Sequence, residues 1–125
     1  MSVCVLVLDD DSVVCTTIQH VLGRTGYDVH SATNFAGAIA LAESQQFDLF
    51  ITDMVMPDID GVTVILAFKS KFPEIPVIAM SGGARFGTSD MLAAAKEVGA
   101  DEILRKPFGA EPLVAAVNTV LSERR

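Results

Sequence analysis

Basic residues are scarce in this chain. Nine lysines and arginines stand against sixteen aspartates and glutamates, which gives a formal net charge of −7. Nucleic acids and anionic lipid surfaces are both bound through basic patches that replace released counterions. We therefore expect no direct nucleic-acid partner, and we expect a protein or a small cation as the ligand instead.

Cysteines and long apolar runs are also few. Only Cys4 and Cys15 are present, with no histidine near them at the spacing of a metal site, so we expect reduced thiols that pack as small apolar groups. The apolar stretches are only strand-length, far short of the roughly 20 residues that a membrane span needs. The N-terminus has neither the basic region nor the cleavage site of a signal peptide. These features predict no membrane insertion and a soluble, cytoplasmic protein.

Short apolar blocks alternate with helical patterns along the whole chain. Residues 3–8 are continuously apolar, as are 49–51 and 77–80, which is typical of strands covered on both faces. Between such blocks, apolar residues recur at helical spacing, for example at Val14, Ile18 and Leu22. The predicted strands are 3–8, 28–32, 48–52, 76–80 and 102–105, and the predicted helices are 12–24, 35–45, 61–71, 89–98 and 110–122.

Residues that start and stop helices support these boundaries. The expected N-caps are Asp11 or Ser12, Asn34 and Ser89, and the expected helix ends are at Gly26 and Gly99. Alternating strands and helices build a parallel sheet with helices on both faces, and the chain is too short for an eight-stranded barrel. We predict an α/β fold, an open doubly wound five-stranded parallel sheet, in one domain over residues 1–125.

Charged and hydroxyl side chains follow the apolar blocks. Ligands of open parallel sheets bind beyond the carboxyl ends of the strands, where this chain has Asp9, Asp10, Asp53, Ser81 and Lys106. Adjacent strands lie about 4.8 Å apart, so carboxylates that end neighbouring strands can reach one cation. Without a cation, two such charges 4 Å apart repel by about 4 kcal/mol at an effective dielectric constant of 20. An all-oxygen ligand set favours Mg²⁺ over zinc or iron.

Phosphoryl transfer would use each of these groups. Its catalysis consists mainly of positioning the reactants and neutralising charge on the moving group. Asp53 is the candidate nucleophile and would form an aspartyl phosphate, while the cation and Lys106 hold the phosphoryl oxygens. The hydroxyl of Ser81 would donate a hydrogen bond to a further oxygen. We expect Ser81-Gly82-Gly83 to be a flexible turn that lets this hydroxyl move in.

Four motifs together resemble the receiver domain of two-component response regulators, from one end of the chain to the other. They are Val7–Asp11, Asp53–Gly61, Met80–Gly82 and Lys106–Phe108, and their order and spacing make the resemblance specific. It implies a flavodoxin-like sheet with strand order 2-1-3-4-5. It also implies that a sensor histidine kinase or a histidine phosphotransfer protein supplies the phosphoryl group to Asp53.

The same resemblance assigns roles to single residues. Asp10, Asp53 and the Val55 carbonyl would bind Mg²⁺, with Asp9 nearby or acting through water. Lys106 would contact the phosphoryl group and precede a cis peptide bond at the following proline. Movement of Ser81 would reshape the face built from the fourth helix, the fifth strand and the fifth helix. The domain would catalyse only its own phosphorylation and dephosphorylation, so we do not expect an enzyme.

The chain departs from the family pattern at two places. The residue three before Lys106, usually an aromatic switch, is Ile103, so the inward swing of a ring is not expected. The positions that tune dephosphorylation, two residues after Asp53 and two after Ser81, are Val55 and Gly83. Neither side chain can position a water molecule, so we expect slow self-hydrolysis of the phosphate.

Two alternative functions stay open. Asp9 to Val13 also resembles the opening of haloacid-dehalogenase-type phosphatases, in which Asp9 would be the nucleophile. That family's acidic motif after the lysine is missing, because only Glu111 and Glu123 follow. The second alternative is a protein-binding module that keeps the fold and signals without phosphate, which the isoleucine at position 103 favours.

Overall fold

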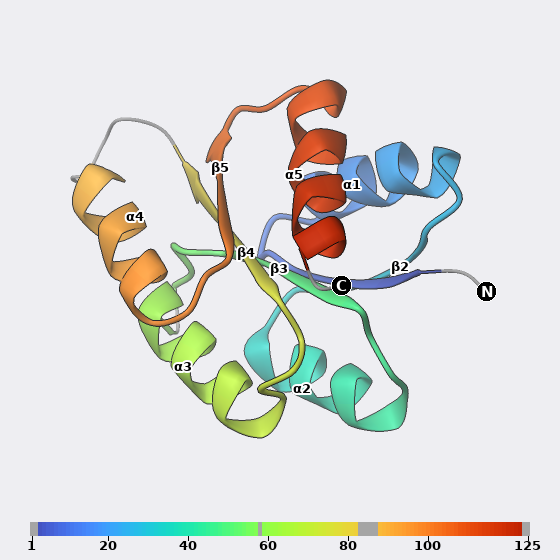
Figure 1. Cartoon of the computed structure of the whole chain (residues 1–125). Coiled ribbons are helices and arrows are strands. Elements are labelled where there is room, and N and C mark those ends of the chain that lie inside the picture. The colour runs from blue at the N-terminus through green and yellow to red at the C-terminus, as the bar shows by residue number, and fades with distance from the viewer. Residues whose placement is uncertain (1–2, 58, 83–87, 124–125) are drawn as a thin grey trace.

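A five-stranded parallel sheet with helices on both sides makes up the structure (Figure 1), and its strands lie in the order β2-β1-β3-β4-β5. The computed structural model describes residues 3–57, 59–82 and 88–123, with the backbone alone at 88–92. The strands are β1 (Cys4–Leu8), β2 (Asp28–Ala32), β3 (Leu49–Asp53), β4 (Val77–Gly82) and β5 (Glu102–Lys106). The helices are α1 (Ser12–Arg24), α2 (Phe35–Ser44), α3 (Gly61–Lys71), α4 (Thr88–Glu97) and α5 (Ala110–Glu123). The predicted fold class and strand order are confirmed.

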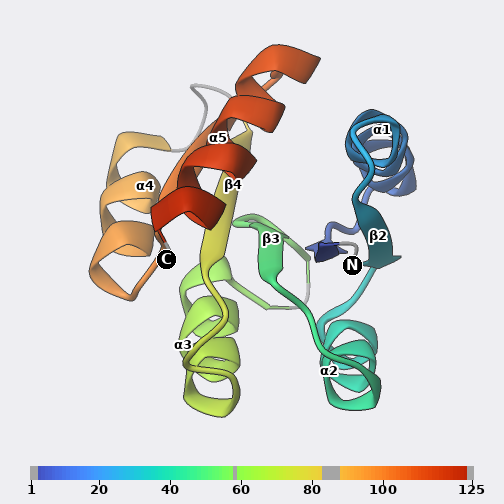
Figure 2. The ribbon, with the colours of Figure 1, turned by 45° about the vertical axis from the view of Figure 1, so that its right-hand side comes forward.

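The helices form two layers that enclose the sheet. Figures 1 and 2 show α1 and α5 on one face, and α2, α3 and α4 on the other. Each face has its own cluster of buried apolar side chains, and β1, β3 and β4 contribute to both clusters. In β1, for example, Leu6 and Leu8 join the α2/α3 cluster, while Val5 and Val7 join the α1/α5 cluster. This division explains why β1 is apolar at every position, because both of its faces are covered.

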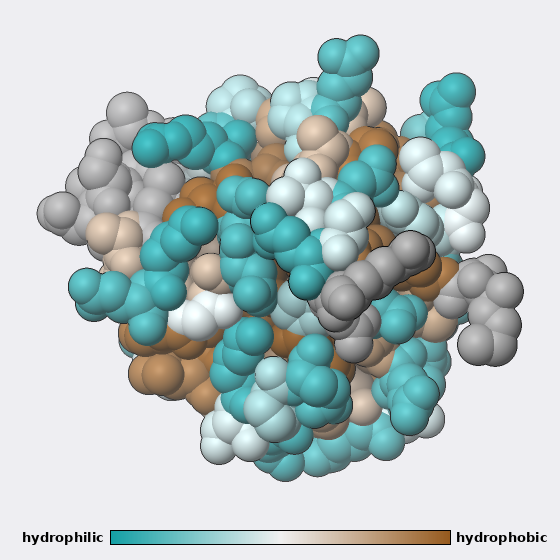
Figure 3. Space-filling view, in the orientation of Figure 1, coloured by the Kyte–Doolittle hydropathy of each residue, from teal (hydrophilic) through white to brown (hydrophobic). Residues whose placement is uncertain are grey.

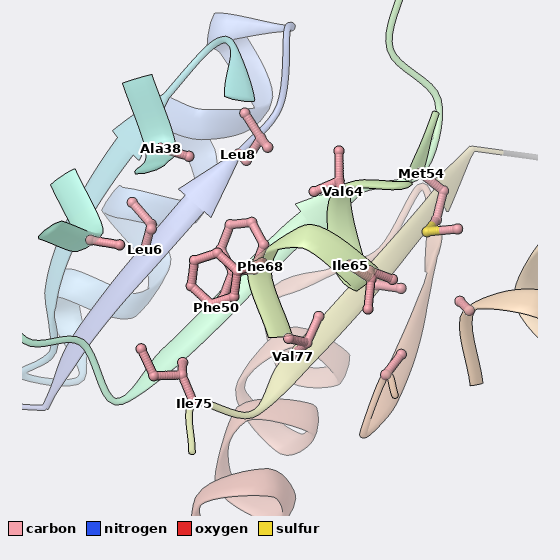
Figure 4. Close-up of a cluster of buried hydrophobic side chains, with 14 of the residues drawn as sticks. Leu6, Leu8, Ala38, Phe50, Met54, Val64, Ile65, Phe68, Ile75 and Val77 are labelled. Carbon is pink, nitrogen blue, oxygen red and sulfur yellow. The ribbon is translucent and has the colours of Figure 1, made fainter. Parts of the chain in front are cut away.

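An aromatic pair lies at the centre of the α2/α3 cluster. The rings of Phe50 on β3 and Phe68 on α3 are stacked, with centroids 4.0 Å apart and an interplanar angle of 19° (Figure 4). Both side chains are fully buried, and Leu6, Ile65 and Val77 lie around them in the same cluster. Burial of large apolar side chains of this kind is the main favourable contribution to folding, roughly 1.5–3 kcal/mol for each. The pair therefore fixes α3 on β3, the strand that ends in Asp53.

Side-chain caps fix where three of the helices begin. Asp11 accepts a hydrogen bond from the Val13 amide, and Asn34 accepts one from Gly37, so both predicted caps are confirmed. The cap of α3, Asp60, was not predicted. The prediction of Ser89 as a cap is wrong, because α4 already begins at Thr88. Gly26 and Gly99 end their helices with positive φ angles of 95° and 115°, as expected.

The predicted element boundaries hold within one residue, except at the end of β4, which lies two residues further along the chain than predicted. This strand continues through Ser81 and Gly82, which pair with Arg105 and Lys106 of β5. The expected flexible turn is therefore wrong for Ser81 and Gly82, while Gly83 lies outside the described residues. Local sequence favours a turn at a serine followed by glycines, but pairing with a neighbouring strand overrides that preference.

Two expectations from composition can also be compared with the structure. Cys4 and Cys15 are both free thiols, with Cys15 buried and Cys4 half-buried. Burial raises the pKa of each thiol above its ordinary value, which agrees with packing as neutral apolar groups. Within the part of the chain that the structure describes, no helix is long and apolar enough to cross a membrane.

A close contact between backbones joins the end of β3 to the start of α3. The Gly61 amide donates to the Met54 carbonyl at 3.0 Å. A Cβ atom on Gly61 would lie 2.5 Å from the Met54 Cα and 2.6 Å from its Sδ. No real Cβ contact is that short with backbone, so any larger residue at position 61 must displace the segment that follows Asp53.

We predict that Gly61→Ala lowers the free energy of unfolding by about 1–3 kcal/mol, the usual range for an overpacked site. Gly23→Ala is the matched control, because Gly23 is a helical glycine whose added Cβ would meet nothing within 4 Å. That control should be neutral or gain about 0.5–1 kcal/mol. Urea denaturation of both variants measures the difference, and equal stabilities would contradict the contact.

Candidate functional site

The predicted site residues meet at the carboxyl edge of the sheet. Asp9 follows β1 directly, Asp53 ends β3, Ser81 lies near the end of β4 and Lys106 ends β5. The four strands are consecutive neighbours in the sheet, so their ends lie at the same edge. Ser81 is buried, with 1% of its surface exposed.

Three carboxylates form the centre of this site. Asp9, Asp10 and Asp53 each offer an oxygen, and these oxygens all lie within 4.8 Å of one another. Asp9 and Asp53 are buried, with 1% and 4% of their surface exposed, whereas Asp10 is exposed. Among the described residues, no other group of histidine, cysteine or acidic side chains has the proximity that a metal ion requires. The prediction that these carboxylates converge is confirmed.

Lys106 supplies the positive charge of the site. Its Nζ lies 2.6 Å from an oxygen of Asp9 and 3.2 Å from an oxygen of Asp53, so it pairs with both buried carboxylates. Burial lowers the pKa of Lys106, but the hydrogen bond to Asp9 and the charge of Asp53 outweigh this, so the pKa is raised overall. Lys106 is therefore a fixed cation.

The Asp53 carboxyl is poorly stabilised as an anion. Burial, followed by the negative charge of Asp9, raises the pKa of Asp53 to about 6. The positive charge of Lys106 and hydrogen bonds from Lys106 and the Val55 amide act in the opposite direction without cancelling the increase. One lysine thus compensates the cluster only in part, and a further cation at the carboxylates would stabilise the ionised form of Asp53.

The residues present fit a divalent cation. Carboxylate oxygens are hard ligands of the kind that Mg²⁺ prefers, and the part of the site formed by Asp9, Asp10 and Asp53 has no sulfur or imidazole ligand. Asp10 is the most accessible of the three and Asp53 projects from the adjacent strand. The Val55 carbonyl stays a predicted ligand.

A network of backbone contacts holds Asp9 in place. One oxygen of its carboxylate accepts from the Asp11 amide at 2.9 Å, and the other accepts from Lys106. Its own amide donates to the Ala32 carbonyl, and its carbonyl accepts a hydrogen bond from the Cys15 thiol at 3.4 Å. Asp9 is therefore an anchor for Lys106 as much as a candidate ligand. Sequence reasoning missed the contact with Cys15, since helical spacing indicates only that Cys15 faces the core.

The segment after β3 forms the other wall of the site. Val55 and Asp60 form an isolated antiparallel bridge, and Asp60 also caps α3 through the Thr63 amide. Val55 itself is half exposed, with 50% of its surface accessible. The predicted cis peptide bond between Lys106 and Pro107 is present. Asp58 lies outside the described residues.

This fold and this group of carboxylates with a lysine define the receiver class of signalling domains. A model of the response regulator receiver domain family matches residues 5–118. The chain belongs to that family and is a receiver domain of the two-component type.

Relatives of known name agree with this assignment. The transcriptional regulatory protein PrrA of Mycobacterium tuberculosis is 38% identical over 120 residues, which cover 96% of this chain and 50% of that protein. The DNA-binding transcriptional regulator NtrC of Rhizobium meliloti is 34% identical over 119 residues, covering 95% of this chain and 24% of that protein. The chain thus spans about half of one relative and about a quarter of the other.

Solved structures match along nearly the whole chain. A response regulator receiver domain protein from Clostridium thermocellum has a TM-score of 0.87 and 30% identity, covering 98% of this chain and 96% of that one. A CheY-like receiver domain protein from Methanospirillum hungatei has a TM-score of 0.90 at 23% identity, covering 99% of this chain and 97% of that one. The second match shows the fold alone.

The pKa of Asp53 predicts how stability depends on pH without a metal ion. The folded protein binds a proton at Asp53 below about pH 6, whereas the unfolded chain binds it only near the ordinary value of 3.8. The folded state is therefore stabilised relative to the unfolded chain as pH falls from about 7 to 4. A difference of one pKa unit between the two states corresponds to about 1.4 kcal/mol of stability. We expect the free energy of unfolding in EDTA to rise by about 1 kcal/mol between pH 7 and pH 5.

Asp53→Asn is the control for this prediction, because it removes the titrating group and keeps its size. The variant should be more stable than the parent at pH 7, and the gain should shrink toward pH 5. The opposing change from Asp60, whose pKa is lowered by hydrogen bonds from Thr63, falls below this window. A pH profile that is identical in parent and variant would show that Asp53 titrates normally.

Proposed function

We propose that Asp53 accepts a phosphoryl group from a phosphohistidine of a sensor histidine kinase or a histidine phosphotransfer protein. The observation that carries this proposal is the pairing of Asp53 with Lys106 at 3.2 Å inside a cluster of three carboxylates. The cluster lies where ligands of open parallel sheets bind. Family membership supports the proposal independently.

The proposed step forms one bond and breaks one. An Asp53 carboxylate oxygen attacks phosphorus, the phosphorus–nitrogen bond of the donor breaks, and its electron pair stays on the imidazole nitrogen, which takes up a proton. A bound Mg²⁺, held by Asp10, Asp53 and the Val55 carbonyl with Asp9 nearby, would neutralise charge on the phosphoryl oxygens. Lys106 contacts the same oxygens, and the Ser81 hydroxyl donates to another.

Asp9 and Lys106 have different electrostatic roles in this proposal. With Asp53 unmodified, the ammonium of Lys106 is shared between Asp9 at 2.6 Å and Asp53 at 3.2 Å. A phosphoryl group on Asp53 brings additional negative charge, so Lys106 reorients toward its oxygens while Asp9 keeps the side chain at the site. Positioning of this kind lets the domain catalyse its own phosphorylation and dephosphorylation, without turning over an external substrate.

The consequence of phosphorylation is proposed to be a change in the face formed by α4, β5 and α5. Ser81 begins this change because it lies on β4, which pairs with β5 along its length. Ile103 replaces the usual aromatic, so no swinging ring takes part. We also propose a cytoplasmic location, which is consistent with the family. The downstream partner is a protein.

The phosphatase alternative has little support in this site. Both oxygens of the Asp9 carboxylate are engaged, one with the Asp11 amide and one with Lys106. A nucleophile at that position would have to break these contacts, and the family match supports a receiver domain. The phosphate-independent binding module remains an outcome of the experiment below.

Incubation with acetyl phosphate and Mg²⁺ should add one phosphoryl group, detected by intact-mass spectrometry. Asp53→Asn should remove this gain, because the nucleophile is lost. Asp9→Asn should retain incorporation at a reduced rate, since Asp9 anchors Lys106 without forming the bond. Incorporation that survives Asp53→Asn and disappears in Asp9→Asn would identify a haloacid-dehalogenase-type phosphatase with Asp9 as its nucleophile. No incorporation in the parent protein would favour a binding module that signals without phosphate.

The aspartyl phosphate should be long-lived. Val55 is half exposed next to Asp53 and its isopropyl group cannot orient an attacking water molecule. We expect Val55→Gln to shorten the half-life several-fold, measured by the decay of the phosphorylated mass after removal of acetyl phosphate. Val13→Gln is the matched control, because Val13 is also an exposed valine, on the first turn of α1. A parent lifetime of seconds would contradict the expectation.

A further inference from the structure

One member of the α1/α5 cluster, Cys15, also contacts the site of the three carboxylates. Its side chain is 3% exposed, and the same cluster contains aliphatic residues such as Val7 and Ile18. Hydrophilic side chains cover much of the face on which α5 lies (Figure 3), and the α1/α5 cluster is buried beneath that surface. Burial alone is compatible with an aliphatic side chain at position 15, so the contacts of the thiol group decide its role.

Two peptide carbonyls lie beside the thiol of Cys15. Its Sγ donates a hydrogen bond to the Asp9 carbonyl at 3.4 Å and lies 3.9 Å from the Ala32 carbonyl. The Ala32 carbonyl also accepts a hydrogen bond from the Asp9 amide at 3.2 Å. Burial raises the pKa of the thiol above its ordinary value, so the sulfur keeps its proton at neutral pH and acts as a donor. The backbone of Asp9 is thus held at its amide by β2 and at its carbonyl by α1.

The Asp9 carbonyl belongs to the peptide group that links Asp9 to Asp10. Because a peptide group is planar, a hydrogen bond to its carbonyl fixes the plane and the direction in which the chain continues to Asp10. A second contact holds the same turn, since the Asp11 amide donates to the Asp9 carboxylate at 2.9 Å. The Cys15 amide in turn donates to the Asp11 carbonyl at 3.3 Å. The first turn of α1 therefore constrains the segment that carries two of the three carboxylates.

We propose that Cys15 is a positioning residue of the cation site, whose thiol orients the Asp9–Asp10 peptide so that both carboxylates face one divalent cation. This inference rests on the proposed function, because it takes the carboxylate cluster as the place where Mg²⁺ binds. Cys15 itself contacts neither the cation nor a phosphoryl group. The constraint matters most for Asp10, because its carboxylate is exposed and its direction follows from the backbone that carries it.

Two substitutions of Cys15 separate the hydrogen bond from packing. Cys15→Ser keeps a hydrogen-bond donor, whereas Cys15→Val fills the space without one. Mg²⁺ alone is titrated into the unphosphorylated full chain, and its dissociation constant is measured by isothermal titration calorimetry. We expect Cys15→Val to bind Mg²⁺ about threefold more weakly than the parent, the effect of one weak hydrogen bond, and Cys15→Ser to keep the parent affinity.

A purely structural role of Cys15 predicts the reverse order. Valine suits an apolar cluster better than a buried serine hydroxyl does, so Cys15→Val should be the more stable variant in urea denaturation. Mg²⁺ affinity that follows this stability order, or that is equal in both variants and the parent, would contradict the inference. Ile18→Val is the control, because Ile18 is fully buried in the same cluster and loses one methyl group. This control should lower stability and keep the parent affinity for Mg²⁺, and a threefold loss would count equally against the inference.

The coupling between thiol and cation must also be seen from the thiol. Coupling of two sites is reciprocal, so bound Mg²⁺ should make local opening around Cys15 rarer and slow the labelling of its thiol. Reaction with dithiobis(nitrobenzoic acid) is followed in Cys4→Ser, in which Cys15 is the only cysteine. We expect Mg²⁺ to slow this reaction by about threefold or more, and the slowing to disappear when Asp10→Asn is added. No slowing, or the same slowing with Asp10→Asn, would show that the thiol and the cation site are independent.

The outcome is separable from that of the proposed phosphoryl transfer. A parent protein that binds no Mg²⁺ and incorporates no phosphate would overturn the proposed function and this inference together. A parent that does both, combined with parent affinity for Mg²⁺ in Cys15→Val, would leave the proposed function intact and overturn the role of Cys15 alone.

Discussion

The pairing of Lys106 with two buried carboxylates is the interaction on which the site depends. Asp9 follows β1 and Asp53 ends the neighbouring strand β3, and both are nearly inaccessible to solvent, so their mutual repulsion is strong. The ammonium of Lys106 contacts both and makes their burial tolerable. It does so incompletely, as the raised pKa of Asp53 shows. The ionised form of Asp53 is therefore destabilised in the buried site, and binding of a cation there would relieve part of this destabilisation. Ionisable groups with shifted pKa values of this kind are typical of functional sites.

The two-layer architecture explains why this cluster is rigid. The strands β1, β3 and β4 are covered on both faces by apolar clusters, and the stacked rings of Phe50 and Phe68 fix α3 against β3. The hydrogen bond from the Gly61 amide to the Met54 carbonyl also joins the start of α3 to the end of β3. Asp53 therefore projects from the end of a strand that is packed on both faces. A rigid element of this kind positions a reacting group accurately.

Much of this structure could be predicted from local sequence. Continuous apolar blocks such as Val5–Leu8 identified buried strands, and polar residues directly after those blocks identified the site. Parallel strands place such residues at one edge, so the convergence of Asp9, Asp53 and Lys106 followed from topology. The order of the strands did not follow, because an apolar block does not specify its neighbours, and it came from resemblance to a family.

The errors were made where long-range pairing decides the structure. Ser81 and Gly82 have turn composition, yet β5 pairs with them and extends β4. The engagement of both Asp9 oxygens and the hydrogen bond from the Cys15 thiol depend on the distance between two elements, which spacing along the chain does not reveal. The bridge between Val55 and Asp60 is of the same kind, although Asp60-Gly61 before an apolar helical pattern was a usable signal for a cap.

Lys106 also has a mechanical effect on the sheet. It starts from the edge strand β5 and reaches Asp9 beyond β1, with β3 and β4 lying between those two strands. Its side chain thus links the edge strand β5 to the residue that follows β1, across the ends of the two strands between them. Any event that draws the ammonium away from Asp9 removes this link, and within the sheet β5 is then held by its pairing with β4 alone.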